Sequence, residues 1–315
     1  MDIEKIGKAI KYLRQRAGYT QLELAERLMV SDKAVSRWER GKGIPDVSLL
    51  RRISIILDTD IDSLLEGSVA VSENSWKGLL YIDYAVDIII YDKPLVDYLL
   101  SYFMLVKVRD IIIFASYKQI GYIQTRFGNG DSLNISLSYY ERDNEPLSAL
   151  LYNHQELFAN SNVMILYGPC ILYGTDLTRF LRRGMLNEGK NSTLLMVKND
   201  PRTEVYMNED KNVVKKADTG VILQYHYSLL PFLYVHSGIK SILGEYCSFE
   251  ELIDRMIDMK KIYAEPMDKG FVDFDARDYE EILRASFFIS IVQKQTGTMV
   301  CDVKEIAIRR GFIRE

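Results

Sequence analysis

The chain has 315 residues, of which 48% are hydrophobic and seven are proline, and its formal net charge is −4. This composition is typical of globular proteins and excludes a disordered chain and a molecule that is polybasic throughout. The charge is uneven, because residues 1–56 contain twelve Lys or Arg and seven Asp or Glu (net +5), whereas the remainder has a net charge of −9. A basic N-terminal part joined to an acidic remainder predicts that the N-terminal part alone contacts phosphate.

The length is comfortable for two domains. The cysteines form no CxxC pair, so neither a disulfide framework nor a zinc site is indicated; they are Cys170, Cys247 and Cys301. The N-terminus carries early charges and no apolar core, which argues against a signal peptide. The apolar runs are too short to cross a bilayer. We therefore expect a cytoplasmic protein without membrane contact, and no cofactor is indicated.

Apolar residues at helical spacing predict a first helix that ends near Gly18. Its apolar positions are Ile3, Ile6, Ile10 and Leu13. Thr20 is a good N-cap for a second helix, and Glu23 completes a capping box with it. The apolar positions of the second helix are Leu22, Leu24, Ala25 and Leu28.

A tight turn at residues 29–31 leads into a third helix from Asp32 to about Arg40. Its inward residues are predicted to be Ala34, Val35 and Trp38. A fourth helix is predicted from Asp46, and a short fifth helix over residues 61–65.

Residues 20–41, TQLELAERLMVSDKAVSRWERG, combine two short helices, a tight turn and a basic cluster. This is the form of a helix-turn-helix that places its second helix in the DNA major groove. The stretch resembles the Cro/C1-type (XRE) DNA-binding domain, and the resemblance covers about residues 3–66. It implies that double-stranded DNA is the partner, and that the DNA-binding residues are Gln21, Ser31, Lys33, Ser36, Arg37 and Arg40.

Within that set, the resemblance implies that Gln21 hydrogen-bonds a phosphate. Lys33, Ser36 and Arg37 would reach base edges or nearby phosphates. The competing interpretation is a helical bundle that binds protein. The combined spacing and caps favour DNA binding, and Trp38 is interpreted as core.

Small and polar residues predict a linker at residues 68–75. From Trp76, β-rich runs alternate with helical segments, which favours an α/β sheet. The expected strands lie at residues 77–82, 110–116, 132–139, 163–168 and 193–198. We thus expect an all-α five-helix domain over residues 1–67 and an α/β domain over residues 76–315.

The C-terminal part resembles sugar-phosphate nucleotidyltransferases of the glucose-1-phosphate thymidylyltransferase type over about residues 76–314. The resemblance rests on Lys77-Gly78, segment 91–116, Gly128-Asn129-Gly130, LYGPCILYGTDL at 166–177, Asn199-Asp200-Pro201, and segments 282–297 and 304–313. It implies a Rossmann-like fold with a mixed sheet, and an oligomer.

That family transfers a nucleotide onto a sugar 1-phosphate, using a glycine-rich phosphate loop, an Arg, a Lys and two Mg²⁺-binding aspartates. Here the loop is missing, because Lys77 and Tyr91 are only fourteen positions apart. The family lysine falls on Ala85, the first metal aspartate on Pro169, and the glycine beside the base near Pro146. The family's EEKP segment is also missing after residue 217.

Asp275 is the candidate for the second metal aspartate, and it is either a metal ligand, a remnant or a local cap. Losing one oxyanion-type contact alone typically costs ~10²–10³ in rate. These departures from the family pattern therefore predict a domain without catalytic or cofactor-binding residues.

Three functions remain open. The first is a transcriptional regulator whose second domain supplies oligomerisation, as a homodimer or higher oligomer, or senses a sugar nucleotide or sugar phosphate. The second is an active nucleotidyltransferase that regulates its own supply. The third is a scaffold whose large domain only oligomerises.

Overall fold

The chain divides into two compact units, Met1–Glu73 and Asn74–Glu315. The computed structural model describes residues 2–16, 19–57, 59, 61–66, 76–143, 145–158, 161–186, 191–197, 205–207, 213–215, 227–236, 249–259, 261–267 and 270–313. The predicted linker at 68–75 lies outside these residues, as do residues 199–201, 216–217 and Cys247. Across the described residues, no helix is both long and apolar enough to cross a membrane.

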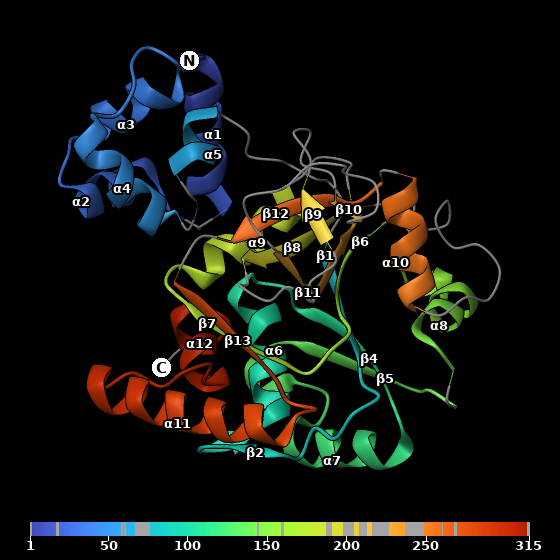
Figure 1. Ribbon diagram of the computed structural model, residues 1–315. Helices are drawn as coiled ribbons and strands as arrows, with labels where there is room; N and C mark the ends of the chain where they lie inside the picture. The colour runs from blue at the N-terminus through green and yellow to red at the C-terminus, as the bar shows by residue number, and fades with distance from the viewer. Residues whose placement is uncertain are drawn as a thin grey trace. The chain divides into compact units, whose positions relative to one another are not determined.

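The described part of the N-terminal unit is entirely helical (Figure 1). Its helices are α1 (Ile3–Arg16), α2 (Gln21–Leu28), α3 (Asp32–Glu39), α4 (Val47–Ile56) and α5 (Ile61–Glu66). Local sequence sets their ends: Thr20 and Glu23 form the predicted capping box, and Ser31 Oγ accepts a hydrogen bond from the Ala34 amide.

The core of this unit is formed by apolar residues from all five helices and includes Trp38. A Cβ atom on Gly7 would lie only 2.2 Å from the Trp38 carbonyl oxygen, so glycine is what lets α1 approach the end of α3. Two of the apolar positions of α1 and α2 lie outside this core, because Leu22 is 57% exposed and Ile3 is 42% exposed. At 3.6 residues per turn, Leu22 lies about 200° from Leu24 and so faces away from the core.

The C-terminal unit is built on a mixed sheet, as the sequence predicts. Its described strands have the order β10-β9-β11-β6-β1-β4-β5, and β8 pairs with both β11 and β12. The strands β6, β1, β4 and β5 are parallel, whereas β11 is antiparallel to β6 and to β8. The bounds are β1 Trp76–Tyr81, β4 Asp110–Ala115, β5 Ser136–Glu141, β6 Asn162–Leu166, β8 Ser192–Val197, β9 Val205–Met207, β10 Val213–Lys215, β11 Tyr227–Val235 and β12 Tyr263–Met267.

One strand prediction needs correction. Residues 132–139 do not form one strand, because Asp131–Leu133 is a 3₁₀ turn and β5 begins only at Ser136. Asn134 has a φ of 51°, a left-handed conformation that an asparagine tolerates better than most residues and that a strand does not contain.

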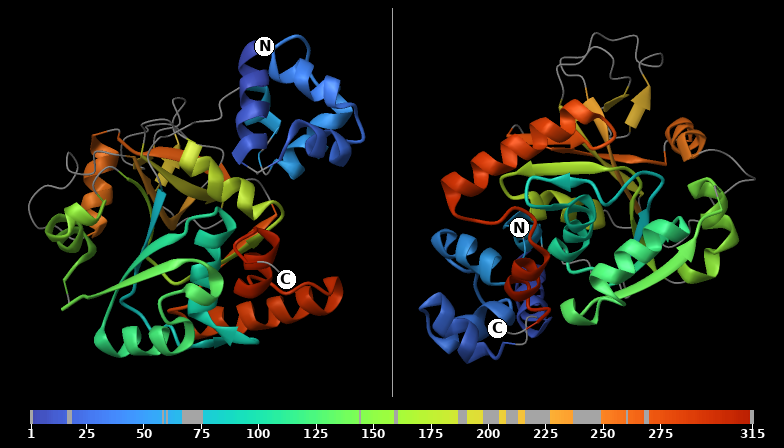
Figure 2. Two further views of the ribbon diagram at one scale, coloured as in Figure 1. Left: turned by 180° about the vertical axis from the view of Figure 1, so that it is seen from behind. Right: turned by 90° about the horizontal axis from the view of Figure 1, so that it is seen from below.

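Both faces of the sheet are covered by helices (Figures 1 and 2). Residues alternate between the two cores along the central strand: Leu80 packs on one face, and Leu79 and Tyr81 pack on the other. The first face is covered by α6 (Leu95–Leu105), α7 (Tyr117–Phe127), α9 (Leu177–Leu186), α11 (Tyr279–Thr296) and α12 (Val303–Arg309). The second face is covered by α8 (Leu147–Asn153) and α10 (Phe249–Asp258).

Two short strand pairs complete the unit. The strand β13 (Phe271–Asp275) pairs antiparallel with β7 (Cys170–Gly174), and β2 (Ile89–Ile90) pairs with β3 (Lys93–Pro94). The first of these pairs lies next to the carboxyl end of β6, where it contributes to the pocket described below.

Candidate functional sites

The outward face of α3 carries a group of polar and basic side chains. Lys33 and Arg37 are exposed and lie one turn apart, and Ser36 between them is half-buried. Val35 and Trp38 are buried on the opposite side of the helix. The sequence-predicted residues on α3 are therefore brought together on one surface, together with Arg40 at its end.

Both arginines of this group donate hydrogen bonds to backbone carbonyls. Arg37 Nε donates to the Lys42 carbonyl oxygen at 2.9 Å, and Arg40 Nε donates to the Ser36 carbonyl oxygen at 3.1 Å. Each guanidinium keeps further N–H donors beyond the one used here. Ser31, in contrast, uses its hydroxyl oxygen as the N-cap of α3.

A buried carboxylate joins the first three helices, and sequence reasoning missed it. Glu39, at the end of α3, is 7% exposed and accepts from Arg14 Nε at 2.5 Å and Arg14 Nη2 at 3.0 Å. Gln21 Nε2 donates to the same carboxylate at 2.7 Å. We refer to Arg14, Gln21 and Glu39 as the Glu39 cluster. Because its members come from α1, the start of α2 and α3, the cluster holds α3 in its orientation relative to the other two helices.

The cluster also bears on the role of Gln21. One N–H of its amide is used inside the unit, and the second N–H remains as a donor. A phosphate contact by Gln21 thus stays a prediction. In addition, the Gln21 side chain has a structural role, because it donates to Glu39. No local pattern could have revealed Glu39, because Arg14 lies 25 positions away from it.

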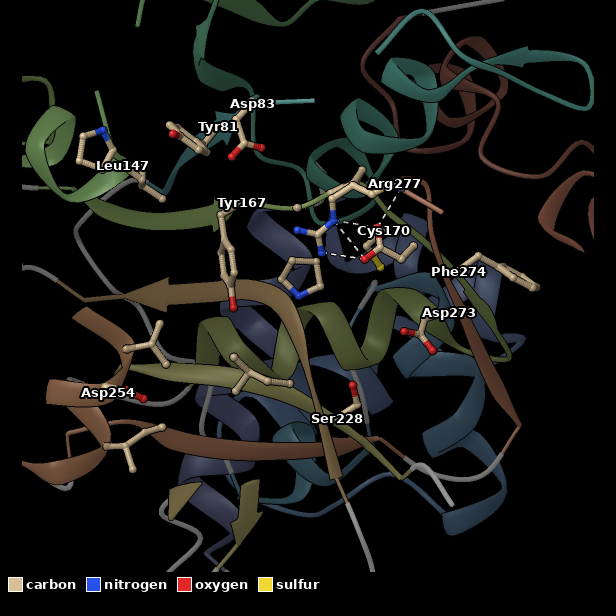
Figure 3. A pocket seen from close by; sticks show the side chains of 18 residues that line it. Tyr81, Asp83, Leu147, Tyr167, Cys170, Ser228, Asp254, Asp273, Phe274 and Arg277 are labelled. Carbon is tan, nitrogen blue, oxygen red and sulfur yellow. Dashed lines mark hydrogen bonds and ion pairs between the residues drawn. The ribbon is translucent and has the colours of Figure 1, made fainter. Parts of the chain in front are cut away.

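A pocket of about 760 Å³ opens at the carboxyl ends of the parallel strands of the C-terminal unit. Tyr81 and Asp83 come from the end of β1, and Tyr167 to Pro169 follow β6 (Figure 3). The crevice outside the carboxyl ends of the strands is where open α/β sheets bind ligands. The remaining described lining residues are Pro146, Leu147, Cys170, Ser228, Leu229, Pro231, Ile253, Asp254, Ile257, Asp273, Phe274, Asp275 and Arg277.

Asp275 is held by an arginine that lies two residues along the chain. Arg277 Nη2 donates to Asp275 Oδ2 at 2.7 Å, and Arg277 Nε donates to Oδ1 at 3.0 Å. The backbone amide of Arg277 donates to Oδ1 at 2.9 Å. The hydrogen bonds that Arg277 donates to Asp275 raise the pKa of the Arg277 guanidinium, which stays charged. Figure 3 shows this guanidinium projecting into the pocket near Tyr167 and Cys170.

The described residues do not fit the two-aspartate Mg²⁺ site that the resemblance implies. Pro169 has no side-chain oxygen, and its carbonyl accepts from the Ala276 amide at 2.8 Å. The Asp275 carboxylate binds the Arg277 guanidinium in place of a metal cation. Asp83 and Asp273 also line the pocket, but nowhere in the described residues are three His, Cys, Asp or Glu side chains grouped to hold a metal ion.

Two tyrosines at the pocket differ in position. Tyr167 lines the pocket, whereas Tyr84 is buried in the core beside it. Burial raises the pKa of Tyr84 well above its usual value, and its hydroxyl finds no partner among the residues described. Cys170 is 5% exposed, as expected for a small buried residue.

Comparison with known proteins bears on both units. Residues 10–64 match the helix-turn-helix family model. The chain is 38% identical over 68 residues to the HTH-type transcriptional activator BcrR of Enterococcus faecalis, which covers 22% of this chain and 33% of the activator. It is 25% identical over 237 residues to a glucose-1-phosphate thymidylyltransferase of Neisseria meningitidis, covering 72% of this chain and 82% of the enzyme. The chain joins an XRE-type helix-turn-helix domain to a thymidylyltransferase homologue.

Further relatives agree with this assignment. A glucose-1-phosphate thymidylyltransferase of Mycolicibacterium smegmatis is 27% identical over 235 residues, covering 71% of this chain and 81% of the enzyme. The crystal structure of a putative glucose-1-phosphate thymidylyltransferase from Bacillus anthracis in complex with a sucrose has a TM-score of 0.56 at 13% identity. It covers 68% of this chain and 95% of that one, which supports the fold.

Both resemblances predicted from the sequence are thus confirmed, as is the fold class. In the helix-turn-helix domain, α2 and α3 are the two helices of the motif. In the thymidylyltransferase-like region, the pocket lies at the edge of the sheet expected for ligand binding.

Proposed function

We propose that the protein is a DNA-binding transcriptional regulator, in which α3 enters the major groove and the thymidylyltransferase-like region is non-catalytic. The observation that carries the proposal is the exposed face of α3, where Lys33, Ser36 and Arg37 lie together on a helix fixed by the Glu39 cluster. Rigid presentation matters, since base readout depends on side chains meeting base edges at defined positions.

The pocket supports the non-catalytic half of the proposal. Nucleotide transfer in the related enzymes, as the resemblance implies, needs two carboxylates for Mg²⁺, but one position holds Pro169 and the other, Asp275, is neutralised by Arg277. We propose that the pocket retains a ligand-sensing role. A sugar nucleotide or sugar phosphate would bind there without a metal ion and would accept hydrogen bonds from the N–H groups of Arg277 that Asp275 does not use.

The DNA-binding half is tested with the double variant Lys33→Ala/Arg37→Ala. We expect the full chain to retard a fragment of its own upstream region, and the double variant to bind it at least about tenfold more weakly, since a good base contact is worth about 1–3 kcal/mol. Lys8→Ala/Lys11→Ala is the matched control, because it removes two exposed basic residues of α1. If both double variants bind the fragment equally well, α3 is not the helix that reads the DNA.

The alternative, an active nucleotidyltransferase, is tested by pyrophosphate release with all four nucleoside triphosphates, glucose 1-phosphate and Mg²⁺. We expect no release above that of an Asp275→Ala variant. Turnover that depends on Asp275 would contradict the non-catalytic assignment.

The sensing role is tested separately by thermal shift against a panel of sugar nucleotides and sugar phosphates in the presence of a metal chelator. We expect at least one of them to raise the melting temperature of the wild type and not of Arg277→Ala. Arg284→Ala is the control, because it removes an exposed arginine outside the pocket lining. No shift with any ligand would instead favour the scaffold function.

A further inference from the structure

The helix α11 carries a stripe of large apolar side chains on its outward face. Tyr279, Leu283, Phe287 and Ile291 recur every four residues and are 72%, 52%, 71% and 44% exposed. We refer to these four residues as the α11 stripe. Residues four apart lie above one another on a helix, so the stripe is continuous over three turns.

The stripe is separate from the face by which α11 packs on its own unit. That inner face is formed by Ala285 and Ile289, which are fully buried, with Ile282, Phe288 and Val292 packed beside them. Figures 1 and 2 show α11 at the periphery of the C-terminal unit. The helix therefore has two apolar faces, and the residues that the structure describes cover only one of them. A continuous exposed apolar surface of this kind is typical of an interaction site.

We infer that the α11 stripe packs antiparallel against the α11 stripe of a second copy of this chain. The charges at the ends of the stripe favour this occupant. At 3.6 residues per turn, Glu280 at the start of the helix and Lys294 at its end fall on the same side as the stripe. Both are exposed. In an antiparallel pair, Glu280 of each copy lies toward Lys294 of the other.

A parallel arrangement would bring like charges together at both ends. The antiparallel arrangement also opposes the two helix dipoles, which is the favourable orientation. A two-fold pair places the same patch on both copies, so a single stripe suffices to form a closed dimer.

The use of this dimer rests on the proposed function. Helix-turn-helix domains read pairs of half-sites as dimers, and the C-terminal unit would supply the two-fold axis that pairs them. The surface itself is tested without DNA, so that its failure and the failure of the proposed function are distinguishable.

The direct test is the mass of the full chain in solution by analytical ultracentrifugation. We expect the wild type to be a dimer or a higher oligomer that contains this dimer. Phe287→Glu should raise the dimer dissociation constant at least about 30-fold, the size of a typical hot-spot loss. Tyr117→Glu is the matched control, because Tyr117 is an aromatic residue of α7 that is 78% exposed. It should leave the mass unchanged, and circular dichroism should show that both variants are folded.

A charge exchange tests the direction of the helices. Glu280→Lys and Lys294→Glu should each weaken the dimer, and the double variant Glu280→Lys/Lys294→Glu should restore it. A monomeric wild type, or a Phe287→Glu variant that dimerises like the Tyr117→Glu control, would overturn the inference. If Phe287→Glu weakens the dimer but the double exchange Glu280→Lys/Lys294→Glu does not restore it, the antiparallel arrangement is overturned. A dimer through α11 that binds no DNA would leave this surface in place and contradict the proposed function instead.

Discussion

At the scale of single residues, the most consequential side chain is Glu39. It is buried and satisfied by two partners from other helices, Arg14 and Gln21. The caps at Thr20 and Ser31 could be predicted because their partners lie within three residues. The Glu39 cluster could not be predicted, because it depends on the packing of α1, α2 and α3 against each other.

Glu39→Ala is expected to destabilise the helix-turn-helix domain by about 3–5 kcal/mol, since it leaves the Arg14 charge buried without its carboxylate. Thermal unfolding of the full chain, followed on the first transition, measures the loss. Glu26→Ala removes an exposed carboxylate of α2 and should change the stability by less than about 0.5 kcal/mol. Equal stability of the two variants would show that the cluster does not hold the helices.

At the scale of elements, tyrosines on α6 tie this helix to its neighbours. Tyr98 Oη donates to the Ile90 carbonyl oxygen at 3.0 Å, and Tyr102 Oη accepts from the Leu172 amide at 2.7 Å. Burial raises the pKa of both phenols. Burial likewise raises the pKa of Tyr139, on β5, to about 12.

These raised pKa values predict alkaline unfolding of the C-terminal unit. The unfolded chain loses its phenol protons near pH ~10, while the folded unit keeps them, so the stabilisation is complete below that pH and is lost as the pH rises toward the folded values. Titration followed by tyrosinate absorbance should show a cooperative step that coincides with loss of the near-ultraviolet circular dichroism. Ordinary phenol titration with an unchanged dichroism spectrum would contradict it.

For helix α11, the sequence alone does not show which face is internal. Its sequence, ILRASFFISIV within residues 282–292, is apolar around most of its circumference. Spacing alone therefore could not separate the face at Ala285 and Ile289 from the exposed stripe at Leu283 and Phe287. Only the contacts with β13 and β2 decide which face is internal.

At the scale of the whole molecule, the sequence was sufficient for the class of both units and for the two resemblances. The caps and the spacing of α2 and α3 are local, and the segments shared with the thymidylyltransferases are continuous stretches. The pocket could be predicted only in part. Asp275 and Pro169 can be singled out from the sequence, but Asp83 and Asp254 cannot, because they reach the pocket from the end of β1 and from α10, which are distant in the chain. Arg277 lies only two residues from Asp275, and its sequence position alone does not show that the two side chains pair.

The uneven charge predicts how binding responds to salt. The N-terminal residues carry the positive charge, and each phosphate contact adds about −0.9 to the slope of log affinity against log salt. Lys33→Ala/Arg37→Ala should make the slope shallower by at most about 2 if both residues meet phosphates. A slope that is equally shallow in Lys8→Ala/Lys11→Ala would indicate general attraction instead of contacts by α3.

We propose that this chain reads a DNA sequence through α3. The most direct test is the ratio of its affinity for a fragment of its own upstream region to its affinity for a shuffled fragment of equal length, at one physiological salt concentration. We expect a ratio of at least about 10³ for the wild type and a ratio close to one for Lys33→Ala/Arg37→Ala. Equal affinity of the wild type for genomic fragments and their shuffled counterparts, or no binding to any of them, would contradict it.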